Sequence, residues 1–395
     1  MAKKGNNEGS IYKDKQGRWR GQVTLPSADG KIKKKYFYGK TKKEVTEKVN
    51  ELLNQIRTNT YIEPCKMTLY EWLCTWLETY NSDIRMTTKI NYDTYIHKHI
   101  KNSVGSYKLC ELNTLIIQQF YMDKSKNGRI DGAGGLSPKT LRNLHNMLHK
   151  ALNQAVYLEM IQKNPTDFAV LPKRQQKEMR YFTVEEQQKL QKVIRGHRLE
   201  MAILLDLYTG MRQGELLGLA WKDVHINPDG NSYIRITQTL NRIKNPDSTS
   251  EHKTMLAINE PKTSHSVRTI PLLPEIAECL EQHRREQENY HQQNGYQPPE
   301  FVFTSTTGTP IEPRDFQRDF KKILQKNNIR EVNVHGIRHT YAVRALESGM
   351  SVKTLSAILG HSSCNVSTQY YIASDINTKN IAMKTMKPFY DELLG

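Results

Sequence analysis

A set of arginine, lysine, histidine and tyrosine residues in the second half of the chain has the side-chain types that phosphoryl transfer to a tyrosine requires. The non-bridging oxygens of a phosphodiester gain charge in the transition state, and two arginines can clamp them with permanently charged, bidentate forks. A lysine or histidine must donate a proton to the leaving 5′ oxygen, and a histidine can accept the proton of a tyrosine, whose free pKa is about 10. In chain order, the residues that fill these roles are Arg212, Lys262, His335, Arg338, His361 and the pair Tyr370-Tyr371.

Short motifs place these residues at the ends of predicted helices and strands. Arg212 follows a glycine turn and lies near the start of a helix, where backbone N–H groups favour an anion. Lys262 precedes a strand, so we expect it on a hairpin tip or a strand edge. His335 and Arg338 are three residues apart and share one face of a helix. His361 follows a glycine that can end a helix.

Each feature also has an ordinary structural explanation when it is taken alone. Arg212 and Glu215 could form a surface ion pair, and Lys262 could be one of many solvated lysines. A histidine near a helix end is more often structural than catalytic, and paired tyrosines more often pack than attack. The complete set favours the catalytic interpretation, because it supplies every chemical role once.

The first 60 residues are the most basic part of the chain, with 12 Lys and 3 Arg against 6 acidic residues, a net charge of +9. Strand-like runs at 9–12, 19–25 and 33–38, with a hairpin signal at Asp29-Gly30, precede a helical pattern at 41–57. We predict a three-stranded sheet packed on a helix, with a basic, aromatic-rich face suited to a DNA groove. A merely solvated basic surface is the alternative. The predicted DNA contacts are Arg18, Arg20, Lys33 and Lys35.

From residue 66 to 170 the apolar residues recur at helical spacing, which predicts a compact bundle of four or five helices. Ser137-Pro138 has the N-cap and N1 residues typical of a helix start. The histidines of this region lack an accompanying cluster of acids or cysteines, so we interpret them as structural and not as metal ligands. The linker that follows is basic, and it either lies along a DNA backbone, through Lys173 and Arg174, or is a soluble tether.

The third predicted domain, residues 178–395, begins with the capping box T-x-x-E at Thr183 to Glu186. Two helices precede strand patterns at 233–240 and 267–272, and helices continue to the end of the chain. The predicted fold class is multidomain and mainly α, with a three-stranded sheet plus helix at 1–60, a helical bundle at 66–170 and a mixed α+β domain at 178–395.

Composition narrows the class of partner and the compartment. The 58 basic residues exceed the 41 acidic ones by 17, which favours a polyanion; nucleic acid is the first candidate, and an anionic membrane or the ribosome fits equally well. The five cysteines are scattered without a C-x-x-C pair, which argues against a disulfide framework or a zinc site. No segment approaches the length of a membrane span or a signal peptide, so we expect a cytoplasmic protein.

The motifs T-G-x-R-x-x-E-L, H-G-x-R-H-T and L-G-H-S-S together resemble those of the tyrosine recombinase (lambda-type integrase) family, most of all the integrases of conjugative transposons. The resemblance covers the whole chain and implies an arm-type DNA-binding domain, a core-site-binding helical domain and a catalytic domain. By this resemblance, Arg212 and Arg338 clamp the scissile phosphate, and Lys262 is the general acid for the leaving hydroxyl. His335 and His361 assist proton transfer.

The resemblance also selects the nucleophile. Integrases of mobile elements with an arm-binding domain favour the longer of two histidine-to-tyrosine spacings, which selects Tyr371, and Tyr370 is then a packing residue. The family's nucleophile is commonly followed two residues on by histidine, whereas Ile372-Ala373 follow here. Glu215 is interpreted as supporting the site without taking part in the chemistry.

The resemblance implies integration and excision of a mobile genetic element through a 3′-phosphotyrosine, with no ATP, metal or other cofactor. The implied partners are double-stranded DNA with core-type and arm-type sites, three further copies of the chain in a homotetramer, and an excision helper protein. The C-terminal segment 377–394 either docks on a neighbouring copy or packs on its own domain. Two rival functions are a non-cutting, sequence-specific DNA-binding regulator and a topoisomerase that uses the same chemistry without partner exchange.

Overall fold

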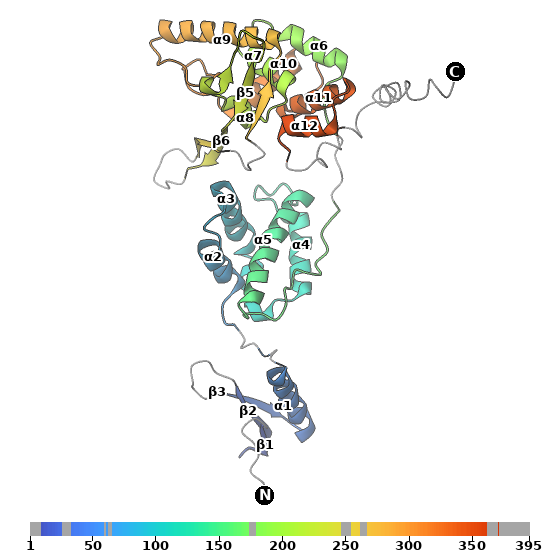
Figure 1. The fold of residues 1–395 in the computed structure, drawn as a ribbon. Coiled ribbons are helices and arrows are strands. Elements are labelled where there is room, and N and C mark those ends of the chain that lie inside the picture. The colour runs from blue at the N-terminus through green and yellow to red at the C-terminus, as the bar shows by residue number, and fades with distance from the viewer. Residues whose placement is uncertain are drawn as a thin grey trace, which may run out of the picture. The chain divides into compact units, whose positions relative to one another are not determined.

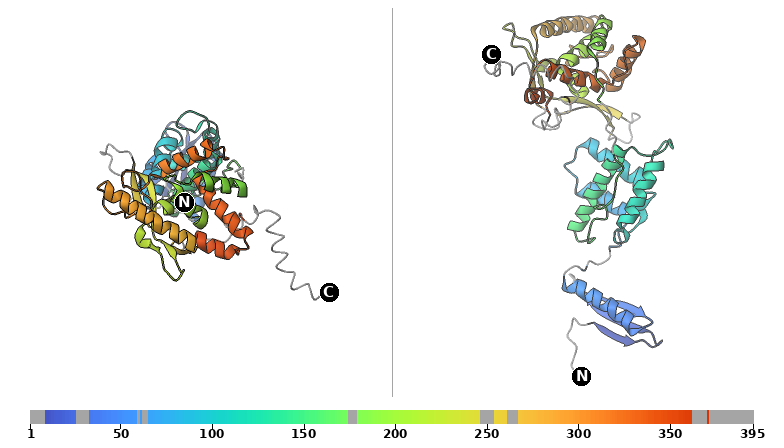
Figure 2. Two further views of the ribbon diagram at one scale, coloured as in Figure 1. Left: turned by 90° about the horizontal axis from the view of Figure 1, so that it is seen from above. Right: turned by 90° about the vertical axis from the view of Figure 1, so that its right-hand side faces the viewer.

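The computed structural model describes residues 9–25, 33–58, 61, 65–173, 179–245, 254–260, 267–361 and 370. The chain divides into two compact units, Met1–Gln175 and Gln176–Gly395, and each is described by itself (Figures 1 and 2). The first unit contains two hydrophobic clusters, one in its N-terminal sheet and helix and one in its helical bundle. The predicted hairpin turn at Asp29-Gly30 and the C-terminal segment 377–394 lie outside the described residues.

The N-terminal segment forms the predicted sheet and helix. Strands β1 (Ser10–Lys13), β2 (Trp19–Leu25) and β3 (Lys33–Gly39) are antiparallel, with β2 in the centre, and helix α1 (Lys42–Arg57) packs on one face. Because alternate residues of a strand point to opposite faces, Val23 and Phe37 pack on α1 while their strand neighbours point away from it. Gly21 lets the helix approach closely, since a Cβ there would lie 2.6 Å from a methyl group of Val49.

The first unit also contains a helical bundle, as the predicted fold class expects, with helices between Leu69 and Tyr157. Ser137 caps α5 by accepting a hydrogen bond from the Thr140 N–H, with Pro138 in the first turn, as the sequence indicates. Trp72 of α2 donates from its indole N–H to the Ala151 carbonyl of α5 at 3.0 Å, which links the first and last helices. The bundle consists of α2 (Leu69–Thr79), α3 (Met86–Thr94) with a π-helical continuation (Tyr95–Ile100), α4 (Thr114–Asn127), α5 (Pro138–Tyr157) and two short 3₁₀ turns (Val104–Ser106, Leu109–Glu111).

The second unit is mainly helical with small antiparallel sheets (Figure 1). It opens on α6, whose capping box between Thr183 and Glu186 is confirmed. A hydrophobic cluster formed mainly by α7, α8, α10 and the central strands fills its interior. Its elements are α6 (Val184–Val193), α7 (Glu200–Thr209), α8 (Gln213–Leu217), a 3₁₀ turn (Trp221–Asp223), β4 (Val224–His225), β5 (Tyr233–Ile236), β6 (Thr239–Lys244), β7 (Thr254–Asn259), β8 (Arg268–Pro271), α9 (Pro274–Gln293), α10 (Pro313–Lys326), α11 (Val334–Glu347) and α12 (Val352–Leu359).

The predicted strand at 233–240 is two strands that belong to different sheets. β5 pairs with β4 and β8, whereas β6 pairs with β7, which the sequence pattern did not reveal. The break falls at Thr237 and Gln238, whose side chains bond the Asp223 carboxylate at 2.9 Å and the Gly218 carbonyl at 2.8 Å. These bonds tie the turn between β5 and β6 to the segment after α8, so the chain changes sheets there. In the part of the chain that the structure describes, no helix is long and apolar enough to cross a membrane.

Candidate active site

The buried carboxylate of Glu215 joins two arginines. Glu215 is 4% exposed and lies in the first turn of α8, where one of its oxygens accepts the Arg212 backbone N–H at 2.9 Å. The Arg212 guanidinium donates to the other oxygen at 2.7 Å, and the Arg268 guanidinium, from the start of β8, donates to the first at 2.8 Å. The carboxylate therefore fixes a half-exposed arginine, Arg212, against a buried one, Arg268.

Arg338 is held by carbonyl groups at the ends of two helices. It lies on α11 and is 1% exposed, and its guanidinium donates to the Gly210 carbonyl after α7 and the Leu359 carbonyl at the end of α12, both at 2.8 Å. Gly210 and Gly360 end these helices in the left-handed conformation, with φ of +60° and +63°. Because helix C-termini carry partial negative charge, they stabilise this cation, to which no carboxylate of the described residues is hydrogen-bonded.

Three histidines and Tyr370 lie around Arg338. The His361 Nε2 is 2.8 Å from the Arg338 guanidinium, and the His361 ring is parallel to the Tyr370 ring, with centroids 6.1 Å apart. The Tyr370 hydroxyl is 3.1 Å from the His339 Nδ1, and His339 in turn lies edge-on to His335. Tyr370 is buried and in contact with both His339 and His361.

The described cluster has an excess of positive charge. Arg212, Arg268 and Arg338 carry three cations, and Glu215 keeps its negative charge because Arg268 and Arg212 lower its pKa against the effect of burial. Asp206 of α7 is fully buried and neither carboxyl oxygen has a hydrogen-bond partner among the described residues, so burial raises its pKa well above the usual range and favours the neutral acid. The site is therefore electrostatically prepared for an anion.

Burial and the neighbouring cations keep the histidines neutral. Burial, followed by Arg338 and Arg212, lowers the pKa of His335, and the same causes lower the pKa of His361 to about 4. Burial and His335 lower the pKa of His339 to about 4. Burial and Arg212 lower the pKa of Arg338 to about 10, which leaves it charged at neutral pH. Neutral imidazoles beside charged guanidinium groups can accept a proton or donate a hydrogen bond.

Of the six predicted catalytic residues, the structure describes four and brings them together: Arg212, His335, Arg338 and His361. Lys262 and Tyr371 lie outside the described residues. Arg212 and Glu215 form the ion pair that the sequence allows as an alternative. It is not a surface contact, because the Glu215 carboxylate is buried and also bonds Arg268.

The predicted DNA contacts of the N-terminal sheet fall on opposite faces. Arg18 and Arg20 lie on the face turned away from α1, with Arg20 opposite Tyr38 in the strand register. Lys33 and Lys35 pair with Leu25 and Val23 and so lie on the side of α1. In the linker, Lys173 is exposed and Arg174 lies outside the described residues.

Sequence reasoning missed three residues of this cluster. The sequence pattern places Arg268 only within a strand, although an arginine that opens an apolar strand near the active-site motifs is a usable signal of a buried partner. His339 stands out in the sequence only as part of a motif, and its hydrogen bond to Tyr370 spans 31 residues. Asp206 is an acid within the apolar helix α7, which signals either a buried carboxyl or a partner.

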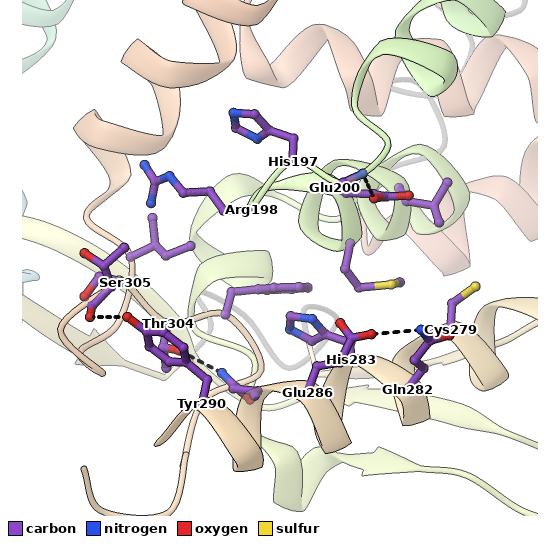
Figure 3. Close-up of a pocket in the computed structure, with 17 residues that line it drawn as sticks. His197, Arg198, Glu200, Cys279, Gln282, His283, Glu286, Tyr290, Thr304 and Ser305 are labelled. Atoms are coloured by element: carbon purple, nitrogen blue, oxygen red, sulfur yellow. Dashed lines mark hydrogen bonds between the residues drawn. The ribbon is translucent and has the colours of Figure 1, made fainter. Parts of the chain in front are cut away.

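A cavity of about 600 Å³ lies elsewhere in the second unit. Glu200 and Met201, at the start of α7, line it, and α9 contributes Cys279, His283 and Tyr290 (Figure 3). The arginine cluster begins at the opposite end of α7, about 15 Å away for a helix of this length. None of the four described residues of the predicted catalytic set lines this cavity. Among the described residues, no group of three or more His, Cys, Asp and Glu side chains could hold a metal ion.

Replacing Glu215 by glutamine should destabilise the second unit. Glu215→Gln keeps the shape but removes the negative charge that bonds the buried guanidinium of Arg268, which should lower the free energy of unfolding by about 3–5 kcal/mol. Chemical denaturation would measure it, with the exposed Glu275→Gln on α9 as the control, for which we expect less than about 0.5 kcal/mol. An equally small effect of both substitutions would mean that Glu215 does not hold the arginines together.

The lowered histidine pKa values predict a loss of stability in acid. Between the folded pKa of about 4 and the ordinary value of 6.5, the unfolded chain binds more protons than the folded one, so the free energy of unfolding falls as the pH is lowered. His339→Gln removes one of these titrating groups. After allowance for partial exposure, the free energy of unfolding of this variant should fall by about 1–2 kcal/mol less than that of the wild type over this pH window. Denaturation curves from pH 7 to 4.5 measure this, and equal losses would contradict it.

Comparisons with known proteins agree on one family. The phage integrase family matches residues 180–377, and the N-terminal SAM-like domain of phage integrases matches residues 68–125. A protein of Caldanaerobacter subterraneus subsp. tengcongensis named tyrosine recombinase XerC-like is 31% identical over 404 residues, which cover 99% of this chain and 100% of the relative.

Two solved structures have the same fold. The integrase of the transposon Tn1549, in complex with transposon right end DNA, has a TM-score of 0.66 and 22% identity over 81% of this chain and 100% of its own. A lambda integrase tetramer bound to a Holliday junction has a TM-score of 0.57 and 18% identity over 95% and 97% of the two chains. The resemblance indicated by the motifs and the predicted fold class are confirmed. This chain belongs to the phage integrase family of tyrosine recombinases, enzymes that cleave and rejoin DNA strands.

Proposed function

We propose that this chain integrates and excises a mobile genetic element at specific DNA sites. The observation that carries the proposal is the pairing of two guanidinium groups at the end of α12. Arg338 donates to the Leu359 carbonyl at 2.8 Å and Arg212 to the adjacent Gly360 carbonyl at 2.9 Å. The proposed catalytic residues are Arg212, Lys262, His335, Arg338, His361 and, as nucleophile, Tyr371.

The two arginines would bind the scissile phosphate. Neighbouring carbonyls hold both guanidinium groups in place before DNA arrives, so little reorganisation is needed when charge develops on the non-bridging oxygens. The side chain of Arg212 is 39% exposed, so it can donate hydrogen bonds to a bound phosphate. Arg338 is buried and supplies a fixed positive charge. Among the described residues of the cluster, three arginines face one ionised carboxylate, and this excess of positive charge favours the phosphate over water.

The proton transfers follow from the protonation states. The Tyr371 oxygen attacks phosphorus and the bond to the 5′ oxygen breaks, while Lys262 gives that oxygen a proton. The tyrosine proton passes to a neutral histidine, His335 or His361, both of which have lowered pKa values. The products are a 3′-phosphotyrosine and a free 5′-hydroxyl. Attack by another 5′-hydroxyl reverses these steps, so the bond energy is conserved and ATP is not needed.

Each of the N-terminal regions would bind a different DNA element. The N-terminal sheet, through Arg18 and Arg20, would bind arm-type sites, while the helical bundle and the linker, through Lys173 and Arg174, would bind core-type sites. Lys33 and Lys35, on the side of α1, would reach only the edge of the same DNA. The similar Tn1549 integrase is in complex with transposon right end DNA, which supports DNA as the substrate here.

Strand exchange between two duplexes needs four active sites, so we propose a homotetramer. The lambda integrase structure, a tetramer on a Holliday junction, supports this assembly. In the same proposal, residues 377–394 dock on a neighbouring copy, a helper protein directs excision, and the chain acts in the cytoplasm, where chromosomal DNA lies. A non-cutting regulator would not need the paired arginines and neutral histidines of the site.

A covalent trapping assay tests the proposed chemistry and the nucleophile. Nicked attachment-site DNA loses the strand that carries the 5′-hydroxyl, so rejoining is prevented and the phosphotyrosine accumulates. We expect the wild type to form the adduct. Tyr370→Phe should form it more slowly, because this variant lacks the hydroxyl that contacts His339, and Tyr371→Phe should form none. If only Tyr370→Phe fails to form the adduct, Tyr370 and not Tyr371 is the nucleophile. Tight binding without any wild-type adduct would favour the regulator.

A further inference from the structure

The sheet face turned away from α1 carries an arginine surrounded by tyrosines. In the strand register Arg20 of β2 lies between Tyr12 of β1 and Tyr38 of β3, and Tyr36 lies on the same face two residues before Tyr38. The three tyrosines are 40–49% exposed, although aromatic side chains of this size are usually more deeply buried. This face therefore presents a rigid, partly apolar surface with a cation in its middle.

The rings hold the Arg20 guanidinium without neutralising it. Its central carbon lies 4.1 Å from the centroid of the Tyr36 ring, 5.6 Å from that of Tyr38 and 5.9 Å from that of Tyr12. Its Nε is buried and has no hydrogen-bond partner. Among the described residues, no carboxylate or carbonyl accepts a hydrogen bond from this guanidinium, so its two terminal nitrogens, which unlike Nε are not buried, can donate to a ligand.

The other basic residues of the sheet differ from Arg20. Arg18 also lies near the Tyr38 ring, but it donates to the Asp14 carboxylate at 3.0 Å, which partly neutralises its charge. Lys34 is exposed on the same face, and its flexible stem carries a point charge without a fork. Lys35 lies on the opposite face, over the rings of Phe37 and Tyr61.

The position of Arg20 on the central strand decides which part of a duplex it can reach. When a β-ribbon enters the major groove, its middle faces the base edges and its margins face the phosphate backbones. A fork already fixed by three rings loses little rotamer freedom on binding, and its parallel donors match the paired acceptors N7 and O6 of guanine. A lysine or a mobile arginine at the margin instead contributes charge, which is independent of sequence.

We propose that Arg20 is the residue of the N-terminal domain that reads a guanine in the major groove of the arm-type site, and that Tyr12, Tyr36 and Tyr38 are positioning residues for its guanidinium. Arg18 and Lys34 contact phosphates and supply affinity. This inference rests on the proposed function, in which the N-terminal domain binds arm-type DNA.

Selection from a randomised duplex library tests the proposal with the full-length chain. Bound sequences would be compared for the wild type, Arg20→Lys, the matched control Arg18→Lys, and a triple charge reversal of Arg18, Arg20 and Lys34 to glutamate. The motif lost in the triple variant defines the arm-type site. We expect one guanine of this motif to lose its preference by about tenfold in Arg20→Lys and to be kept in Arg18→Lys.

The outcomes separate the inference from the function on which it rests. If Arg20→Lys keeps every guanine of the motif, with or without a uniform loss of affinity, Arg20 is a phosphate contact. That result would overturn the inference and leave arm-site binding intact. The same motifs in the wild type and the triple variant would mean that this face does not read DNA, which would overturn both. Tyr36→Leu, which removes the closest ring, should weaken the same guanine preference and no other position.

Discussion

Glu215 places one buried negative charge between the guanidinium groups of Arg212 and Arg268, and the geometry of the arginine cluster depends on this contact. Arg212 precedes the first turn of α8 and Arg268 opens β8, so a single carboxylate joins a helix start to a strand start. Because the carboxylate is buried, leaving it without an arginine partner would be costly, which favours keeping both contacts. Arg212 is thereby held with its outer edge free.

Arg338 is stabilised by a different arrangement, in which helix ends replace a carboxylate. The carbonyls of Gly210 and Leu359 accept its hydrogen bonds, and burial raises the pKa of the nearby Asp206, which favours the neutral acid. An ionised acid beside Arg338 would compete with a phosphate for the same cation. The described residues of the cluster therefore have an excess of positive charge. Burial, followed by the charges of Arg338 and Arg212, lowers the pKa values of His335 and His361 and so keeps these histidines neutral.

The sequence predicted the elements and motifs better than it predicted their contacts. Local signals such as the capping box at Thr183 and the pair Ser137-Pro138 depend on neighbouring residues, so they could be read directly. The bond between Arg268 and Glu215 spans 53 residues and no periodicity encodes it. The division of 233–240 into two strands depends on side-chain bonds from Thr237 and Gln238 to distant groups. The faces of Arg20 and Lys35 followed from strand register, which alternation alone did not fix.

The central claim is that the positive charge of this cluster acts on the scissile phosphate. Cleavage rates of the wild type and Arg212→Ala would be measured on DNA with an ordinary phosphate and with a neutral methylphosphonate at the cleavage position. In this variant the buried Glu215 carboxylate keeps its bond to Arg268, so it is not left unpaired. We expect the substitution to slow cleavage of the phosphate by about 100-fold or more, and to affect the methylphosphonate far less, because it has one fewer charged oxygen to stabilise. An equal loss on both substrates would mean that Arg212 supports the fold and does not clamp the phosphate.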